Sequence, residues 1–134
     1  MLSRLDLAIQ PIPFKDNAFD FVTAHDFIEH VPRILYLPER RNSFVELMSE
    51  IWRVLKNGGK FLSVTPAYPH PAAFRDPTHV NIIAEDTYSE YFCGNEPAGR
   101  MYGFVGSFRL ISQNWNGPYL VSIMECVKQG RHDG

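Results

Sequence analysis

The sequence predicts an α/β fold, because two short apolar runs enclose a segment with helical periodicity. Residues 19–24 and 61–65 are rich in β-forming side chains and are predicted to be strands buried on both faces. Between them, apolar side chains recur at offsets of three and four, the stripe of a helix that lies on a sheet: Phe44, Leu47, Ile51, Val54 and Leu55. Strand, helix and strand together predict one right-handed βαβ unit.

The central helix has two possible starts and one predicted end. Pro38 suits a first helical turn, whereas Ser43 followed by Glu46 has the spacing of a capping box. From either start the helix is expected to run to about Lys56. The pair Gly58-Gly59 is expected to end it, because glycine accepts the left-handed conformation needed just past a helix C-terminus.

The last third of the chain predicts a short helix and an antiparallel hairpin. Acidic residues open the stretch 85–92, which is expected to be helical. Residues 104–111 and 119–127 are strand-like, and Asn116-Gly117 between them is a strong turn signal. We therefore expect these two strands to pair with each other.

The composition limits the classes of function. The chain has 134 residues with 45% hydrophobic and 21% charged side chains, which suits one globular domain. Its formal net charge of -2 and the lack of a Lys/Arg stripe argue against nucleic-acid binding. No apolar run approaches the length of a membrane span, and Cys93 and Cys126 have no metal-site spacing. We expect free thiols and a cytoplasmic protein with no membrane partner.

Several short motifs follow one another in a distinctive order: Ile12-Pro13-Phe14, Asp16-Asn17, Phe19-Asp20, Glu29-His30-Val31, Glu50, Arg53-Val54-Leu55 and Gly58-Gly59. Over residues 12–66 this ordered set resembles the class I S-adenosylmethionine-dependent methyltransferases. The resemblance implies the second half of that family's Rossmann-like domain, from the fourth strand onward. We expect residues 1–134 to form a single partial methyltransferase-like domain. Its truncated Rossmann-like sheet would have about four strands and end in the antiparallel hairpin.

The resemblance implies S-adenosylmethionine as the cofactor. The family binds it chiefly through a glycine-rich turn after the first strand and an acidic residue that ends the second, and this chain begins too late to contain either. Thr23, Ala24 and His25 are the remaining candidates, because ligands bind outside the carboxyl ends of strands in open parallel sheets. Asp6 is the only match for an Asp that contacts the adenine in the family. Its spacing to Pro13 is longer than expected, and it can also be a solvated loop acid.

His30 is a candidate for proton transfer. Asp26 and Glu29 have capping-box spacing and predict a short helix, on which His30 lies one turn after Asp26. A histidine can take a proton from an acceptor hydroxyl near neutral pH. The structural alternative is that His30 packs behind the short helix and bonds a backbone carbonyl. Farther along, Glu50 and Arg53 are interpreted as a surface ion pair rather than as catalytic groups.

The proline-rich loop of residues 66–79 leaves the carboxyl end of a predicted strand, where substrate enters such sheets. It carries Asp76 and His79, and its Asp-Pro-Thr-His run resembles sugar and polyketide O-methyltransferases. These two residues could orient and deprotonate a sugar hydroxyl. Alternatively, Asp76 caps a turn while His79 bonds a carbonyl. A metal site from His70, Asp76 and His79 matches no zinc spacing, so none is predicted.

Two classes of function follow from these observations. The first is methyl transfer from S-adenosylmethionine to a small-molecule acceptor, by resemblance O-methylation of a small-molecule or sugar hydroxyl. The second is a non-catalytic remnant or interaction module that binds no cofactor. In either case the strand at residues 19–24 lacks the neighbour that it has in the family. An unpaired apolar edge favours pairing with another chain, so we expect a homo-oligomer or a partner that supplies the missing strands.

Overall fold

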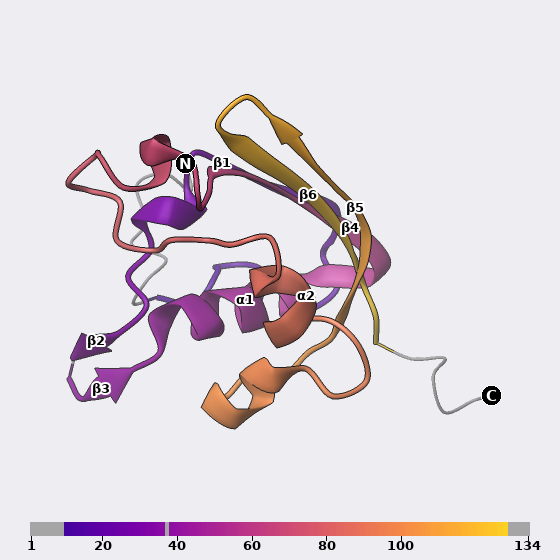
Figure 1. The fold of residues 1–134 in the computed structure, drawn as a ribbon. Coiled ribbons are helices and arrows are strands. Elements are labelled where there is room, and N and C mark those ends of the chain that lie inside the picture. Colours follow the sequence, from indigo (N-terminus) through magenta and orange to yellow (C-terminus); the bar gives the residue numbers. More distant parts are fainter. Residues whose placement is uncertain (1–9, 37, 129–134) are drawn as a thin grey trace.

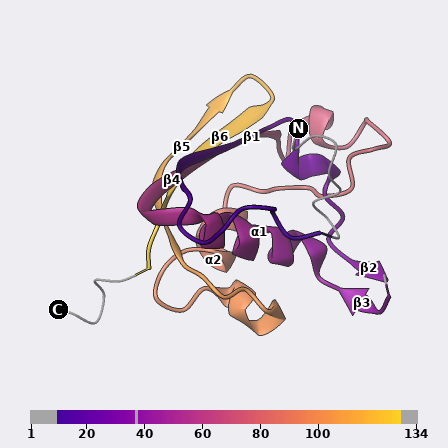
Figure 2. The same cartoon turned by 180° about the vertical axis from the view of Figure 1, so that it is seen from behind.

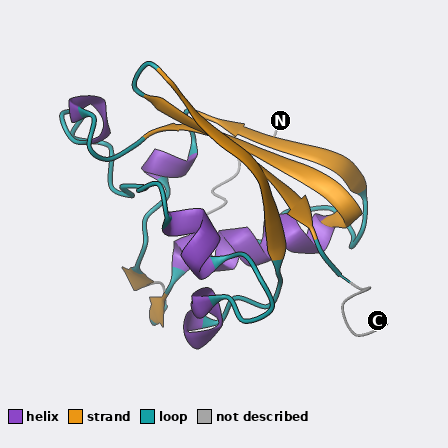
Figure 3. Cartoon of the chain, turned by 45° about the vertical axis from the view of Figure 1, so that its right-hand side comes forward, coloured by secondary structure: helices purple, strands orange, loops and turns teal. Residues whose placement is uncertain are grey.

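The computed structural model describes residues 10–36 and 38–128 (Figure 1). One twisted sheet of four strands forms one layer, and the helices lie together on one of its faces (Figure 3). The strands are β1 (Phe19–His25), β4 (Leu55–Pro66), β5 (Phe108–Asn116) and β6 (Tyr119–Cys126), with a separate small pair, β2 (Leu35–Tyr36) and β3 (Arg40–Arg41). The helices are α1 (Ser43–Val54), α2 (Thr87–Tyr91) and the short 3-10 turns η2 (Ile28–His30), η3 (Pro71–Ala73) and η4 (Ala98–Tyr102).

The sheet has the order β1-β4-β6-β5, which confirms the expected α/β fold with a truncated sheet. β1 and β4 are parallel and joined through α1, so the predicted βαβ unit is present. β6 pairs antiparallel with both β4 and β5, and therefore lies between them. Among the described residues, β1 has a partner on one side only.

The two faces of the sheet differ in burial, unlike the prediction. Along β4 and β6 the side chains alternate between fully buried and half-buried, so only the face toward the helices is closed. In β1 only Ala24 is buried, and Phe21 is 53% exposed. The expectation that residues 19–24 are buried on both faces is therefore wrong. A strand at a sheet edge has fewer neighbours to cover it than the central strand of a complete sheet.

The helix α1 begins at Ser43 and not at Pro38, because the chain before it turns through the β2–β3 pair. It ends at Val54, and β4 begins in the next residue without a glycine cap. The glycine pair lies inside β4 instead. Gly58 has a φ of 85°, and a Cβ on Gly59 would come within 3.1 Å of the Asp20 carbonyl oxygen. These glycines therefore allow the irregular start of the β1–β4 pairing, which is shifted between Phe19 and Phe21.

The segment before β1 is tied to α1 by one arginine. Arg53 donates hydrogen bonds to Glu50, to Asp16 and to the carbonyl oxygen of Ile12, while Glu50 accepts from the Ile12 backbone N–H. Figure 2 shows this segment crossing α1 before it enters β1. The hydrogen bonds that Arg53 donates to Glu50 and Asp16 raise the pKa of its guanidinium. The predicted pair of Glu50 and Arg53 is present, and it fastens a chain segment as well as the helix surface.

The C-terminal elements agree with the prediction in kind. The helix α2 falls within residues 85–92, and the predicted hairpin is formed by β5 and β6. Gly117, with a φ of 61°, provides its turn, so β5 extends to Asn116.

Both cysteines are free, and burial raises the pKa of the Cys93 and Cys126 thiols to about 11. Within residues 10–36 and 38–128, no helix has the length and hydrophobicity needed to cross a lipid bilayer.

Candidate functional site

A pocket of about 320 Å³ lies where β1 and β4 end, beside η2 and the loop that follows β4. This is the edge of the sheet at which parallel α/β proteins bind their ligands. The pocket is lined by polar and ionisable side chains among a few small ones: Asp26, Glu29, His30, Pro66, Ala72, Arg75, Asp76, His79 and Tyr119. Two other pockets, beside α2 and along α1, are lined without histidine.

Glu29 is the buried centre of this pocket. It is 2% exposed, and its Oε1 accepts a hydrogen bond of 2.8 Å from the Thr65 hydroxyl near the end of β4. The predicted capping box is wrong, because Asp26 has a φ of 54° and no side chain caps η2. Glu29 instead points inward, with Oε2 left facing the pocket residue His30 at 3.6 Å. A carboxylate in such a place requires polar partners, because burial of an unpaired charge is costly.

The loop after β4 is fastened onto η2 through the same residue. The backbone N–H groups of Val80 and Asn81 both donate to the Glu29 carbonyl oxygen, at 2.9 and 3.1 Å. The Asn81 side chain donates to the carbonyl oxygen of Ile28. The loop therefore lies against η2 in a defined position (Figure 1), although it is 48 or more residues away in sequence. This contact brings His79 to His30.

Asp76 and Thr78 order the loop and orient His30. Asp76 Oδ1 accepts from the Thr78 backbone N–H at 2.9 Å and from the Thr78 hydroxyl at 2.8 Å, and these bonds lower the pKa of the Asp76 carboxyl. The Thr78 hydroxyl therefore donates its hydrogen to Asp76, and its oxygen can only accept a further hydrogen bond. His30 Nδ1 lies 3.2 Å from that hydroxyl oxygen and 3.2 Å from the Thr78 carbonyl oxygen. Because both oxygens accept, Nδ1 must carry the proton, and Nε2 is left to face Glu29.

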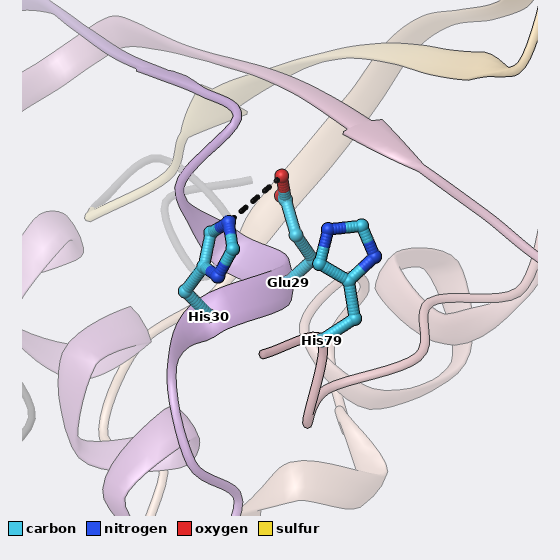
Figure 4. Close-up of side chains that lie close together, drawn as sticks. All are labelled: Glu29, His30 and His79. Atoms are coloured by element: carbon cyan, nitrogen blue, oxygen red, sulfur yellow. Dashed lines mark ion pairs between the residues drawn. The ribbon is translucent and has the colours of Figure 1, made fainter. Parts of the chain in front are cut away.

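His79 is the third member of the cluster. Its side chain is 9% exposed, its ring packs edge-on against the His30 ring at 5.0 Å, and its Nε2 lies 3.6 Å from Asp76 Oδ2. The buried Nδ1 has no hydrogen-bond partner among the described residues. Figure 4 shows Glu29, His30 and His79 gathered around one space. One ligand atom of each lies within 4.8 Å of those of the other two.

The structure brings together all three predicted catalytic candidates, His30, Asp76 and His79, around the pocket. Both structural alternatives also hold in part, because Asp76 caps the turn at Thr78 and His30 bonds a backbone carbonyl. His70 does not join the cluster. Its Nδ1 accepts the backbone N–H of Ala72 at 3.0 Å and so caps η3.

The cofactor candidates divide between exposed and buried positions at the end of β1. Thr23 and His25 are exposed, and the His25 ring stacks on Tyr119 with 6.0 Å between centroids. Ala24 is buried toward the helices. Asp6 lies outside the described residues. The nearby Asp26 carboxylate raises the pKa of the Tyr119 phenol, which therefore remains a hydrogen-bond donor beside the pocket.

Sequence reasoning did not select Glu29 as a candidate site residue, because its spacing from Asp26 suggested a cap. A usable signal was its position between apolar residues, Ile28 and Val31, both of which are buried.

Two larger pockets lie elsewhere. One of about 370 Å³ beside α2 is lined by Arg33, Phe44 and Tyr91 among others, and one of about 520 Å³ lies along α1. Neither combines histidine with a carboxylate.

Comparison with known proteins finds similarity to a methyltransferase family and to solved putative methyltransferases. Residues 3–63 match the family described as a methyltransferase domain. An uncharacterized protein of Methanocaldococcus jannaschii is 25% identical over 103 residues, which cover 77% of this chain and 36% of that protein. A solved putative methyltransferase from Bacillus halodurans is 25% identical with a TM-score of 0.52, over 80% of this chain and 45% of that one.

The putative methyltransferase of Haloferax volcanii, solved in complex with the methyltransferase activator Trm112, has the same fold at lower identity. Its TM-score is 0.60 at 14% identity, over 87% of this chain and 58% of that one. This chain thus spans between 36% and 58% of the length of these three proteins.

Proposed function

We propose that this chain carries part of a class I S-adenosylmethionine-dependent methyltransferase domain and forms the acceptor side of a methyl-transfer site. The acceptor is a small molecule, and its reacting group is a hydroxyl such as that of a sugar. The observation that carries the proposal is the pocket that contains Glu29, His30 and His79 at the carboxyl ends of β1 and β4. This pocket combines hydrogen-bond acceptors for a hydroxyl with groups that can take its proton.

Each pocket residue has a role in this proposal. His79 accepts the proton of the hydroxyl through a ring nitrogen, and Asp76, 3.6 Å from its Nε2, stabilises the resulting imidazolium. His30, oriented by Thr78, and the Tyr119 phenol hold the acceptor. When bound, S-adenosylmethionine supplies an electrophilic methyl group on a sulfonium. The protein acts mainly by positioning, since transfer requires the hydroxyl oxygen in line with that methyl group.

The described residues fit only one side of the cofactor. Thr23 and His25 are exposed at the unpaired edge of the sheet, where a ligand has room to lie. They offer a hydroxyl and an imidazole but no cradle of backbone N–H groups. We therefore expect the remaining contacts to come from another segment or partner beside β1.

The isolated chain is expected to bind S-adenosylmethionine weakly, with a dissociation constant above the micromolar range. The reason is that a small ligand gains affinity from many directed polar contacts, and the described residues supply few of them. Isothermal titration of the pure chain with S-adenosylmethionine measures this directly. Micromolar or tighter binding would contradict the prediction. Tight binding would also exclude the alternative that the chain is a non-catalytic interaction module.

The chain is also expected to associate through the open edge of β1, with a second copy or with a protein that supplies the missing strands. Phe21 is 53% exposed there, and an unpaired strand edge is a template for another strand. Burying an exposed large apolar side chain such as Phe21 contributes about 1.5–3 kcal/mol, so covering the edge is favourable. The activator bound to the Haloferax volcanii protein makes a partner protein an alternative occupant.

Sedimentation equilibrium at micromolar concentration tests the association. We expect a mass above that of a monomer, lowered by Phe21→Lys at the β1 edge. Ile111→Lys is the matched control, because Ile111 is 43% exposed on β5 at the opposite edge. A clean monomer whose mass and solubility are unchanged by Phe21→Lys would show that the edge needs no partner.

A reducing, cytoplasmic location is part of the proposal. It is supported by the two free cysteines. Burial raises the pKa of both thiols, so they stay protonated and are poor nucleophiles. Redox labelling of the thiols in cells would test it.

A further inference from the structure

We propose that Glu29, His30 and His79 form a binding site for a divalent transition-metal cation such as Zn²⁺. The site itself does not depend on methyl transfer, because it is inferred from the geometry and protonation of these side chains alone. It also differs from the set His70, Asp76 and His79 considered from the sequence, since His70 is occupied in capping η3.

The donor set and its spacing suit such a cation. Two histidines and one carboxylate form a common three-ligand set of zinc and non-haem iron sites. A tetrahedral Zn²⁺ with bonds of about 2.0–2.2 Å holds its donor atoms roughly 3.3–3.6 Å apart. Glu29 Oε2 and His30 Nε2 are already 3.6 Å apart. The donor atom of His79 lies within 4.8 Å of both, so a shift of roughly 1 Å completes the set.

The hydrogen bonds at His30 leave a place for a positive charge. Thr78 orients His30 with a proton on Nδ1, so in the neutral ring the lone pair of Nε2 faces the carboxylate oxygen of Glu29. Two acceptors that face each other repel unless a proton or a cation lies between them. A metal ion bound to both atoms removes this repulsion and neutralises a carboxylate that is only 2% exposed.

The surrounding side chains act as supports for the ligands. Thr65 donates to Glu29 Oε1, which leaves Oε2 for the metal. Thr78 fixes the ring of His30, and the Asp76 carboxylate lies beside the His79 ring. Metal-binding histidines usually have such carboxylate or carbonyl partners, which set the tautomer and the ring orientation. His79 is more than nine-tenths buried, and its Nδ1 has no hydrogen-bond partner among the described residues.

Two nitrogen donors favour zinc or a neighbouring first-row metal over Mg²⁺ and Ca²⁺, which prefer oxygen ligands. The three ligands leave at least one position open toward the pocket, where Asp26 and Tyr119 also lie. An acceptor hydroxyl bound there would lose its proton more easily. This last consequence, unlike the site, rests on the proposed function.

The experiment uses the full chain, freed of metal with EDTA and titrated with Co²⁺ and with Zn²⁺. We expect one equivalent to bind, with the intense visible absorption of four- or five-coordinate Co²⁺, and Zn²⁺ to displace it. We also expect Zn²⁺ to raise the melting temperature, because a ligand that binds only the folded state stabilises it. Neither measurement requires methyl-transfer activity.

Three variants and one control distinguish the proposed site from incidental binding. Glu29→Gln keeps an acceptor for Thr65, and His30→Gln changes a partly exposed side chain, so both are expected to fold. Each of these two variants, and likewise His79→Ala, should weaken Co²⁺ binding at least roughly tenfold. Each should also reduce the rise in melting temperature that Zn²⁺ causes. His70→Ala, on the same loop, should leave both unchanged. Absence of binding to the folded wild type, or equal binding by wild type and Glu29→Gln, would overturn the proposal.

Discussion

Replacing His79 with alanine is expected to lower the turnover of the proposed methyl transfer about 10²–10⁴-fold. His79 is the buried histidine of the pocket, and it lies between the carboxylate of Asp76 and the ring of His30. Its removal takes away the group that we propose accepts the hydroxyl proton, or a ligand of the proposed metal. Both roles lead to the same large loss of rate, whereas the melting temperature should fall only by a few degrees.

Transfer of labelled methyl groups from S-adenosylmethionine, measured beside thermal melting, checks this expectation. His70→Ala is the control on the same loop, and it should keep its rate because His70 does not line the pocket. Asp76→Asn should give an intermediate loss, since it weakens support for His79 but leaves the ring. Normal turnover of His79→Ala would refute the assignment, as would a loss of activity that unfolding fully explains.

A single methyl group added at Gly106 is expected to destabilise the fold by about 1–3 kcal/mol or more. A Cβ there would lie 2.4 Å from Cγ of Trp52, well inside van der Waals contact. Trp52 cannot turn aside freely. Its Nε1 donates to the Val127 carbonyl oxygen at 3.1 Å, and Lys128 Nζ lies over its ring at 4.6 Å. Gly106→Ala must therefore disturb the contact between Trp52 of α1 and the residues that follow β6.

Urea unfolding of Gly106→Ala gives the free-energy change, and a double-mutant cycle with Trp52→Ala locates its cause. Once the indole ring is removed, the added methyl group has space and its cost should largely disappear. An unchanged midpoint in the single variant would contradict the prediction. A cost that persists without Trp52 would show that backbone strain, and not contact with the ring, is responsible.

At the end of α1 the predicted and observed structures agree on the helix but differ on the glycine pair. Periodicity located the helix correctly, because its apolar stripe at Phe44, Leu47 and Ile51 is buried against the sheet. The glycine pair was assigned to the wrong role. A left-handed glycine after a helical pattern is compatible with a C-cap and with an irregular strand start. The choice depended on how closely Gly59 approaches Asp20 of β1, which is a contact between segments far apart in sequence.

The position of Glu29 at the site was likewise set by a contact that is distant in sequence. Its spacing from Asp26 allowed a local cap, yet the carboxylate turns inward to Thr65, 36 residues away. His79 was selected from its place on a long loop that leaves a strand end. That it lies against His30 follows from the backbone bonds of Val80 and Asn81 to Glu29. No spacing in the sequence encodes these contacts.

The sequence by itself determined the βαβ unit and the C-terminal hairpin, because apolar periodicity and turn residues act over a few neighbouring positions. It also predicted His30, Asp76 and His79 as candidate site residues, and the structure places all three around one pocket. Only the tertiary structure decided that Glu29 joins them and that His30 presents Nε2 to it. The physical reason is that burial and protonation of a side chain depend on all the groups that surround it, and those groups are brought together only when the loop packs on η2.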